Sequence, residues 1–280
     1  MRDGLAVGVL VLGWLAGAAG PAGAEEGAPP RLAAHRAVYD LSLARSGGSR
    51  GVEGASGRIA VEFSGDACEG YALKFRQVVS LASGETGTRT VDARSDTFES
   101  PAGDSFRFRS QSEAGTPADT LVDGTAARTG DGAVGVRLSE PAPARFALAQ
   151  GTIFPTGHLV RLLRAARGGE RTVTAPVYDG SGDGRKVYDT LAVIGGPIEP
   201  GAQPPVEAPL ADSATAGLRR WPVRLSYFAP GEGDREPAYT MSFELYEDGV
   251  SRALSIDYGE FALNGDLTSF QALPASACGR

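Results

Sequence analysis

The sequence predicts an all-β fold in a single domain, and three observations favour it. Apolar and polar residues alternate with a period of two along most of the chain after residue 34. Clusters of Gly, Asp and Ser separate the alternating runs, as turns between strands do. Only one segment has the periodicity of a helix. Because such alternation is typical of antiparallel strands with one buried face, we expect a mainly antiparallel sheet.

Residues 1–24 have the features of a secretory signal peptide. Arg2 provides a positive start, residues 5–15 are almost uninterruptedly apolar, and Ala22-Gly23-Ala24 offers the small residues that signal peptidase accepts. An uncleaved membrane anchor is disfavoured, because the apolar run is shorter than the roughly 20 residues that a bilayer requires. We therefore expect cleavage after Ala24, a single domain over 25–280 without a transmembrane anchor, and a periplasmic location.

The first half of the mature chain is predicted to consist of strands joined by turns. In the first run His35, Ala37 and Tyr39 share one face, and similar alternation recurs further along. The recurring runs lie at 58–63, 71–76 and 106–109. Glycine-containing clusters such as Asp123-Gly124 are interpreted as the turns between strands.

A helix is expected over about 156–167, with Thr156 as its N-cap and Gly168-Gly169 as its end. Its apolar residues recur at helical spacing, so one face should be buried. Strands then resume, at 171–178, 186–194, 221–228, 237–246, 251–258 and 267–273. The Pro-rich stretch 195–217 is interpreted as a surface loop within one domain, although it could also be an interdomain linker.

Composition limits the class of partner. The 280 residues carry a net charge of −7, and the cations are 25 Arg but only two Lys, without a basic block. A protein with this acidic balance and no basic patch is not expected to bind nucleic acid.

Two cysteines occur, Cys68 and Cys278. In an exported chain two cysteines most simply form a disulfide. A metal or redox pair is the alternative, but the Cys-x-x-Cys spacing and a nearby His are missing. We therefore expect a structural disulfide that closes nearly the whole mature chain.

No set of residues indicates an enzyme, a cofactor or a metal. His35 is expected to be an ordinary strand residue, and His158 could act as a base but lacks an accompanying nucleophile motif. The run 179–184 resembles the opening of a calcium loop, but Thr190 stands where the bidentate acid is needed, so a turn is favoured. Acid pairs that could suggest a glycosidase are interpreted as solvated strand faces. These pairs are Glu244 with Glu247, and Asp257 with Glu260.

Aromatic residues are predicted to face the interior of the sheet. If the sheet curls, they could enclose an apolar groove, or they could fill the core completely. The pattern favours the filled core. The aromatic residues are Tyr39, Phe63, Tyr71, Phe75, Phe106, Phe108, Phe228, Phe243 and Tyr246.

Several runs, in order and spacing, resemble a family of periplasmic cell-envelope integrity proteins of alphaproteobacteria, the EipB-like family, formerly a domain of unknown function. The most specific run is Tyr178-Asp179-Gly180-Ser181-Gly182-Asp183-Gly184-Arg185-Lys186-Val187-Tyr188-Asp189-Thr190. The others are His35 to Leu41, Cys68 to Tyr71, Phe154 to His158, Leu162 to Ala166, Ser242 to Glu247, Gly249 to Arg252, and Asp257 to Gly259.

The resemblance implies a single β-domain wound as an open spiral, or half-barrel, of about fourteen antiparallel strands with one helix. It also implies a disulfide that maps onto Cys68 and Cys278, and a form similar to periplasmic lipoprotein carriers. No catalytic residue is implied. The expected function is a non-enzymatic periplasmic scaffold or binding module that supports envelope integrity under stress, with an envelope protein as a possible partner. The alternative is a carrier that binds a lipid or lipidated peptide in the curled sheet.

Overall fold

The computed structural model describes residues 30–47, 51–84, 87–114, 119–202, 207–231 and 233–274. Within these residues the chain forms one antiparallel sheet of fourteen strands, one α-helix and two short 3-10 helices, so the all-β prediction with one helix is confirmed. The elements are β1 (His35–Ser46), β2 (Gly54–Asp66), β3 (Gly70–Ser83), β4 (Gly87–Glu99), β5 (Ser105–Glu113), β6 (Thr120–Arg128), β7 (Val134–Glu140), β8 (Ala144–Leu148), α1 (Pro155–Gly168), β9 (Thr172–Val177), β10 (Tyr188–Ile194), η1 (Ala208–Leu210), η2 (Ala214–Gly217), β11 (Arg220–Phe228), β12 (Tyr239–Tyr246), β13 (Ser251–Asp257) and β14 (Phe261–Ala272).

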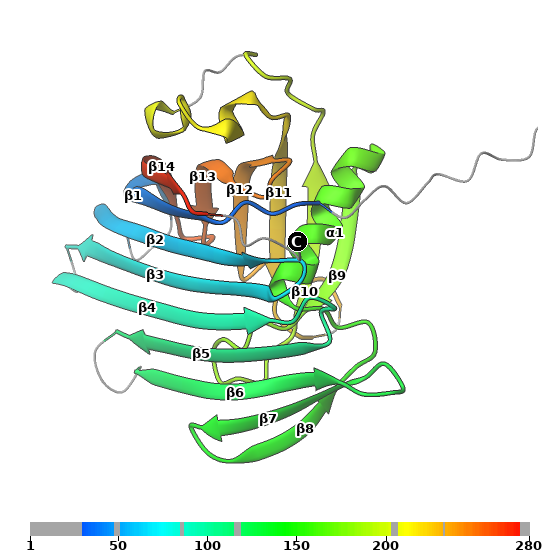
Figure 1. The fold of residues 1–280 in the computed structure, drawn as a ribbon. Coiled ribbons are helices and arrows are strands. Elements are labelled where there is room, and N and C mark those ends of the chain that lie inside the picture. Colours follow the sequence, from blue (N-terminus) through cyan, green and yellow to red (C-terminus); the bar gives the residue numbers. More distant parts are fainter. Residues whose placement is uncertain are drawn as a thin grey trace, which may run out of the picture.

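The first and last strands pair at the middle of the sheet. The strand order is β8-β7-β6-β5-β4-β3-β2-β1-β14-β13-β12-β11-β10-β9, and every pair is antiparallel. The β1–β14 register runs from His35 opposite Ala272 to Ser46 opposite Phe261. Figure 1 shows that the sheet curls, with β1 to β8 on one side of the interior and β9 to β14 on the other. Residues far apart in the sequence therefore face one another across the concave side.

The two edge strands, β8 and β9, are connected through α1. After β8, Ile153 forms an isolated parallel bridge with Val177 of β9. Its N–H donates to the carbonyl of Pro176 at 2.9 Å, and its carbonyl accepts from the N–H of Tyr178 at 3.0 Å. The chain that leaves one edge of the sheet is thus hydrogen-bonded to the other edge.

The N-terminal cap of α1 comes from a strand that is distant in the sequence. Phe154 is the N-cap residue and makes no side-chain capping hydrogen bond, so the prediction that Thr156 caps the helix is wrong. The carboxylate of Glu99, at the end of β4, accepts instead from the backbone N–H of Thr156 at 2.8 Å and of Gly157 at 2.9 Å. A carboxylate is favourable here because the first N–H groups of a helix have no internal partner. At the other end, Gly169 adopts the left-handed conformation (φ 77°) expected of a C-terminal glycine.

The glycine-rich run 179–184 lies in the loop between β9 and β10 and packs on the concave face of β5 to β7. Gly180 has φ +70°, and a Cβ at this position would collide with the ring of Phe108. Gly184 has φ +76°, and a Cβ there would meet Val122 at 2.6 Å. Both glycines therefore allow the loop to approach the sheet closely. The described residues contain no group of three or more His, Cys, Asp or Glu side chains that could hold a metal ion.

The Pro-rich segment 195–217 is anchored in the core, although its sequence suggests only a surface loop. Its described part contains η1 and η2, and the side chain of Leu210 is fully buried. Glu207 forms an ion pair with buried Arg252 at 2.6 Å, and Thr215 donates to Asp248 at 2.7 Å. This segment crosses the end of the β11 to β14 wall in Figure 1.

One local feature of the sheet differs from the sequence interpretation. Asp123-Gly124 is not a turn but lies inside β6, where the register shifts against β7. Gly124 has no room for a side chain, because a Cβ would lie 2.7 Å from the ring of Phe108.

Among the described residues, no helix has the length and apolar character to span a bilayer.

Candidate binding cavity

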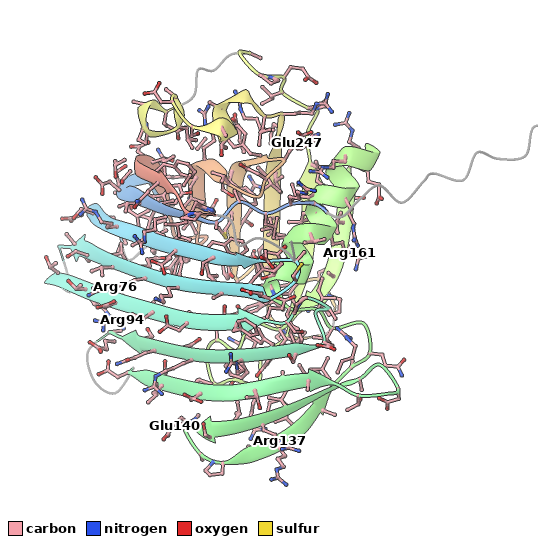
Figure 2. All side chains as sticks on the ribbon, viewed as in Figure 1. Arg76, Arg94, Arg137, Glu140, Arg161 and Glu247 are labelled. Atoms are coloured by element: carbon pink, nitrogen blue, oxygen red, sulfur yellow. The ribbon has the colours of Figure 1, made fainter. Side chains whose placement is uncertain are left out.

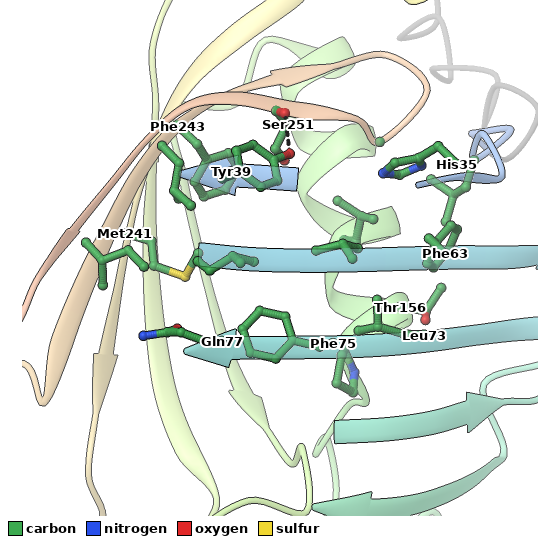
Figure 3. Close-up of a pocket in the computed structure, with 18 of the residues that line it drawn as sticks. His35, Tyr39, Phe63, Leu73, Phe75, Gln77, Thr156, Met241, Phe243 and Ser251 are labelled. Atoms are coloured by element: carbon green, nitrogen blue, oxygen red, sulfur yellow. Dashed lines mark hydrogen bonds between the residues drawn. The ribbon is translucent and has the colours of Figure 1, made fainter. Parts of the chain in front are cut away.

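A cavity of about 470 Å³ lies inside the curled sheet. Strands β1 to β3 form one wall, β12 and β13 form the facing wall, and the first residues of α1 contribute to one end (Figure 3). The β1–β14 pairing holds the two walls together, because it joins the N-terminal half of the sheet to the C-terminal half. The cavity is therefore a product of the topology rather than of one local segment.

The walls of the cavity are mainly apolar. On β2 and β3, Val61 stands opposite Phe75 and Phe63 opposite Leu73 in the antiparallel register. These residues face inward because alternate side chains of a strand lie on the same face. Met241 and Phe243 of β12 project from the facing wall, and Figure 3 shows them across the space from Phe75. A hydrocarbon chain in the cavity would contact apolar side chains on both walls.

A few polar groups are fixed around the apolar walls. His35 is 7% exposed, and its Nδ1 donates to the carbonyl of Ala33 at 2.8 Å. Burial lowers the pKa of His35, so the imidazole is neutral at neutral pH. The hydroxyl of Tyr39 donates to the carbonyl of Ser251 at 2.7 Å, and burial raises the pKa of Tyr39. These groups are neutral, so the cavity offers no ionised partner from either side chain.

A second cleft of about 440 Å³ continues from the cavity along β4, β5 and β6. The two spaces share the lining residues Leu73, Phe75, Pro155 and Met241. The second cleft also has apolar walls, but hydroxyl-bearing residues are more frequent in its lining than in that of the cavity. Its hydroxyl-bearing residues on the strands are Ser95, Thr97, Ser110, Ser112, Thr120 and Tyr227. These residues were not predicted from the sequence, although the small polar side chains at alternate positions of β4 and β5 were a visible signal.

His158 lines this second cleft but does not form a catalytic arrangement. Its side chain is buried, and its Nε2 lies 3.3 Å from the hydroxyl oxygen of Thr190, which itself donates to the carbonyl of Ala175. Burial, with a smaller effect of Arg161, lowers the pKa of His158 to about 4. The imidazole is held by a hydroxyl rather than by a carboxylate, so it is a packed neutral residue rather than an activated base.

One acid of each pair considered in the sequence is engaged in an ion pair. Glu244 accepts from the guanidinium of Arg220 at 2.6 Å, and Arg220 is only 1% exposed. Asp257 pairs with Arg45 at 2.7 Å on the surface.

The predicted disulfide lies partly outside the described residues. Cys68 is exposed in the turn between β2 and β3. Cys278 lies beyond residue 274, outside the described residues, so its pairing with Cys68 stays a prediction.

The predicted inward aromatics divide into a filled region and an open one. Phe106 stacks on Phe108 at 5.4 Å and on Phe154 at 5.0 Å, and these rings fill the space beside β5 to β8. The expectation of a filled core is wrong beside β2, β3 and β12, where the cavity remains open. Phe228 does not line the cavity but lies under the guanidinium of Arg235, 5.9 Å from its carbon to the ring centroid.

Comparisons with known proteins agree with this architecture. A family model described as EipB-like matches residues 26–274. A protein of Brucella abortus (strain 2308) named cell envelope integrity protein EipB is 36% identical over 263 residues, which are 94% of this chain and 91% of that protein. A crystal structure of a beta-barrel-like protein of a domain of unknown function, also from Brucella abortus, superposes with a TM-score of 0.79 and 33% identity. It covers 87% of this chain and 99% of its own. The chain belongs to the EipB-like family.

Proposed function

We propose that this protein supports the integrity of the cell envelope from the periplasm, and that it does so by binding the acyl chain of a lipid or lipidated peptide. The envelope role is supported by the name of the Brucella relative, and export is supported by the features of residues 1–24. The observation that carries the binding function is the apolar cavity of about 470 Å³ inside the sheet.

The size and chemistry of the cavity suit a hydrocarbon chain. Binding pockets for small ligands are mostly apolar, measure roughly 300–1,000 Å³ and carry a few fixed polar groups. Each methylene group transferred from water into such a pocket contributes about 0.8 kcal/mol. Shortening a bound chain by two carbons should therefore weaken binding roughly tenfold.

The experiment compares a variant that obstructs the cavity with a control on the opposite face of the same strand. Val61 lines the cavity, whereas Ala60 is exposed on the convex face of β2. Val61→Phe should weaken the binding of a fluorescent fatty acid at least tenfold, and Ala60→Phe should leave it unchanged. Displacement by saturated fatty acids of increasing length should follow the chain-length dependence above. Equal binding by both variants would contradict the proposal.

The envelope role has its own test in cells. A strain that lacks the gene should be sensitive to detergents and to wall-active antibiotics. Ala60→Phe should restore resistance and Val61→Phe should not. If Val61→Phe abolishes lipid binding but restores resistance fully, the protein acts as a scaffold through protein contacts, and the carrier function is wrong.

A further inference from the structure

Part of the concave face changes its chemistry between β3 and β4. One row of directly paired residues runs across four strands: Val61 on β2, Phe75 on β3, Ser95 on β4 and Ser110 on β5. The first two are apolar and line the cavity, and the last two carry hydroxyls and line the second cleft. Because the register places them side by side, the boundary between the two surfaces is sharp.

One neighbouring row shows the same change at β4, since Phe63 and Leu73 are followed by Thr97. The row on the other side differs, because Ala93 occupies β4 and the hydroxyl appears only on β5, at Ser112. Inward positions of a curled sheet normally carry core residues, since a hydroxyl removed from water without a partner costs free energy. Hydroxyls that persist at inward positions of a cleft are therefore suited to hydrogen-bond a polar ligand.

The hydroxyls retain capacity for a ligand. Ser95 and Ser110 lie 3.3 Å apart, oxygen to oxygen, so one hydroxyl donates to the other. A serine hydroxyl can donate one hydrogen bond and accept two. After the Ser95–Ser110 bond is made, one donor and several acceptor positions remain on this pair. A ligand with its own hydroxyls could both donate to and accept from them.

The wall that faces these hydroxyls contains one aromatic ring, that of Tyr227. Tyr227 lines the second cleft and stacks on Tyr239, with the ring centroids 4.5 Å apart and the planes inclined by 16°. Tyr188 meets both rings edge-on. Aromatic rings pack against the C–H faces of sugar rings, while hydroxyl side chains hydrogen-bond their edges. A tyrosine ring opposite a pair of hydroxyls therefore suits an uncharged sugar.

The charges of the cleft do not favour an anionic group. Arg94 borders the cleft, but its guanidinium pairs with Asp92 at 2.7 Å, and Arg76 pairs with the same carboxylate (both arginines are labelled in Figure 2). Asp179 also lines the cleft and brings a negative charge. The ammonium of Lys186 lies over the ring of Tyr188, 5.4 Å from its centroid. The carboxylate of Asp179 would repel a phosphate group but would not repel an uncharged headgroup.

From this division we propose that the ligand is a glycolipid, with its acyl chain in the apolar cavity and an uncharged sugar headgroup in the hydroxyl-lined cleft. The proposal rests on acyl binding in the cavity and specifies the class of headgroup. The shared lining residues Leu73, Phe75, Pro155 and Met241 place the two parts of such a ligand next to each other.

The test uses three probes with the same alkyl chain and different headgroups: an alkyl maltoside, a fatty acid and an alkyl phosphate. Each displaces a fluorescent fatty acid from the full protein, below its critical micelle concentration. The maltoside should bind at least tenfold more tightly than the alkyl phosphate. The double variant Ser95→Ala/Ser110→Ala should lose roughly tenfold in affinity for the maltoside, as expected for two lost hydrogen bonds, and change little for the fatty acid.

The chain offers a matched control on the convex face. Thr90 donates to Ser80 at 3.3 Å, which is also a cross-strand pair of hydroxyls between neighbouring strands. Ser80→Ala/Thr90→Ala should bind every probe as the unmodified protein does. If no probe binds, acyl binding itself is wrong. If all probes bind but the Ser95/Ser110 variant weakens them equally, or if the alkyl phosphate binds most tightly, acyl binding stands and the glycolipid proposal is overturned.

Discussion

The carboxylate of Glu99 is expected to hold the beginning of α1 against the sheet. It accepts from two backbone N–H groups at 2.8 and 2.9 Å, and its side chain comes from β4, more than fifty residues earlier in the sequence. Glu99→Gln keeps one acceptor oxygen and leaves one N–H without an acceptor. Glu99→Leu leaves both N–H groups without an acceptor. The two variants therefore form a graded series.

The magnitudes follow from these contacts. A buried donor without a partner costs about 1–3 kcal/mol, and both N–H groups are only partly buried, so the lower part of this range applies. Burial raises the pKa of Glu99 although its hydrogen bonds to Thr156 and Gly157 favour the ionised form, so removing the charge offsets part of the loss. We expect the free energy of unfolding to fall by about 1 kcal/mol for Glu99→Gln and by about 2–3 kcal/mol for Glu99→Leu.

Urea unfolding, followed by the fluorescence of buried Trp221, measures these changes. Glu260 is exposed, so Glu260→Gln and Glu260→Leu serve as controls and should stay within about 0.5 kcal/mol of the unmodified protein. If both Glu99 variants are as stable as the controls, the carboxylate does not anchor the helix and the reasoning is refuted.

Three further predictions concern other parts of the fold. Gly180→Ala should destabilise the protein by about 3 kcal/mol in urea unfolding, because of left-handed backbone strain and the clash with Phe108. Gly182→Ala, at φ +67°, should cost only the backbone strain of about 1 kcal/mol. Equal losses in the two variants would contradict the packing of this loop. The pKa of the His158 imidazole is about 4 in the folded protein, and its ordinary value is 6.5. The stability that the neutral, buried imidazole contributes is therefore fully present above pH 6.5 and is lost as the pH falls toward 4. His158→Gln should remove up to about 3 kcal/mol of that acid-induced loss of stability, and an unchanged pH profile would show that the imidazole is not buried as described. Cys68→Ser should lower the thermal stability of the oxidised protein, by up to about 5 kcal/mol on the chain-entropy model, and leave the reduced protein nearly unchanged; two free thiols in periplasmic material would disprove the bridge.

Much of the sheet could be predicted because its strands have one apolar face. The sequence range 171–178 corresponds to β9 at Thr172–Val177, and 251–258 to β13 at Ser251–Asp257. β4 gave a weaker signal, because Ser95 and Thr97 interrupt the apolar residues of its inward face, which include Val91 and Ala93. The missing prediction of β4 and the proposed headgroup site have the same cause, because hydroxyl side chains at inward positions interrupt the apolar pattern of a core strand.

Other features depended on contacts that no local pattern contains. The cap of α1 comes from Glu99 on a distant strand, so a search for a capping residue near Thr156 could not find it. Leu210 stands among Pro and Ala residues without periodicity, yet its side chain is buried in the core. The cavity was also hidden, because inward aromatics such as Phe75 and Phe243 give the same pattern whether the facing walls touch or stand apart.

Native mass spectrometry of protein purified gently from the periplasm, followed by organic extraction, tests the central claim most directly. Unmodified protein and Ala60→Phe should each carry one acylated molecule per chain, and Val61→Phe should not. An unmodified protein that is consistently free of ligand would contradict acyl binding in the cavity.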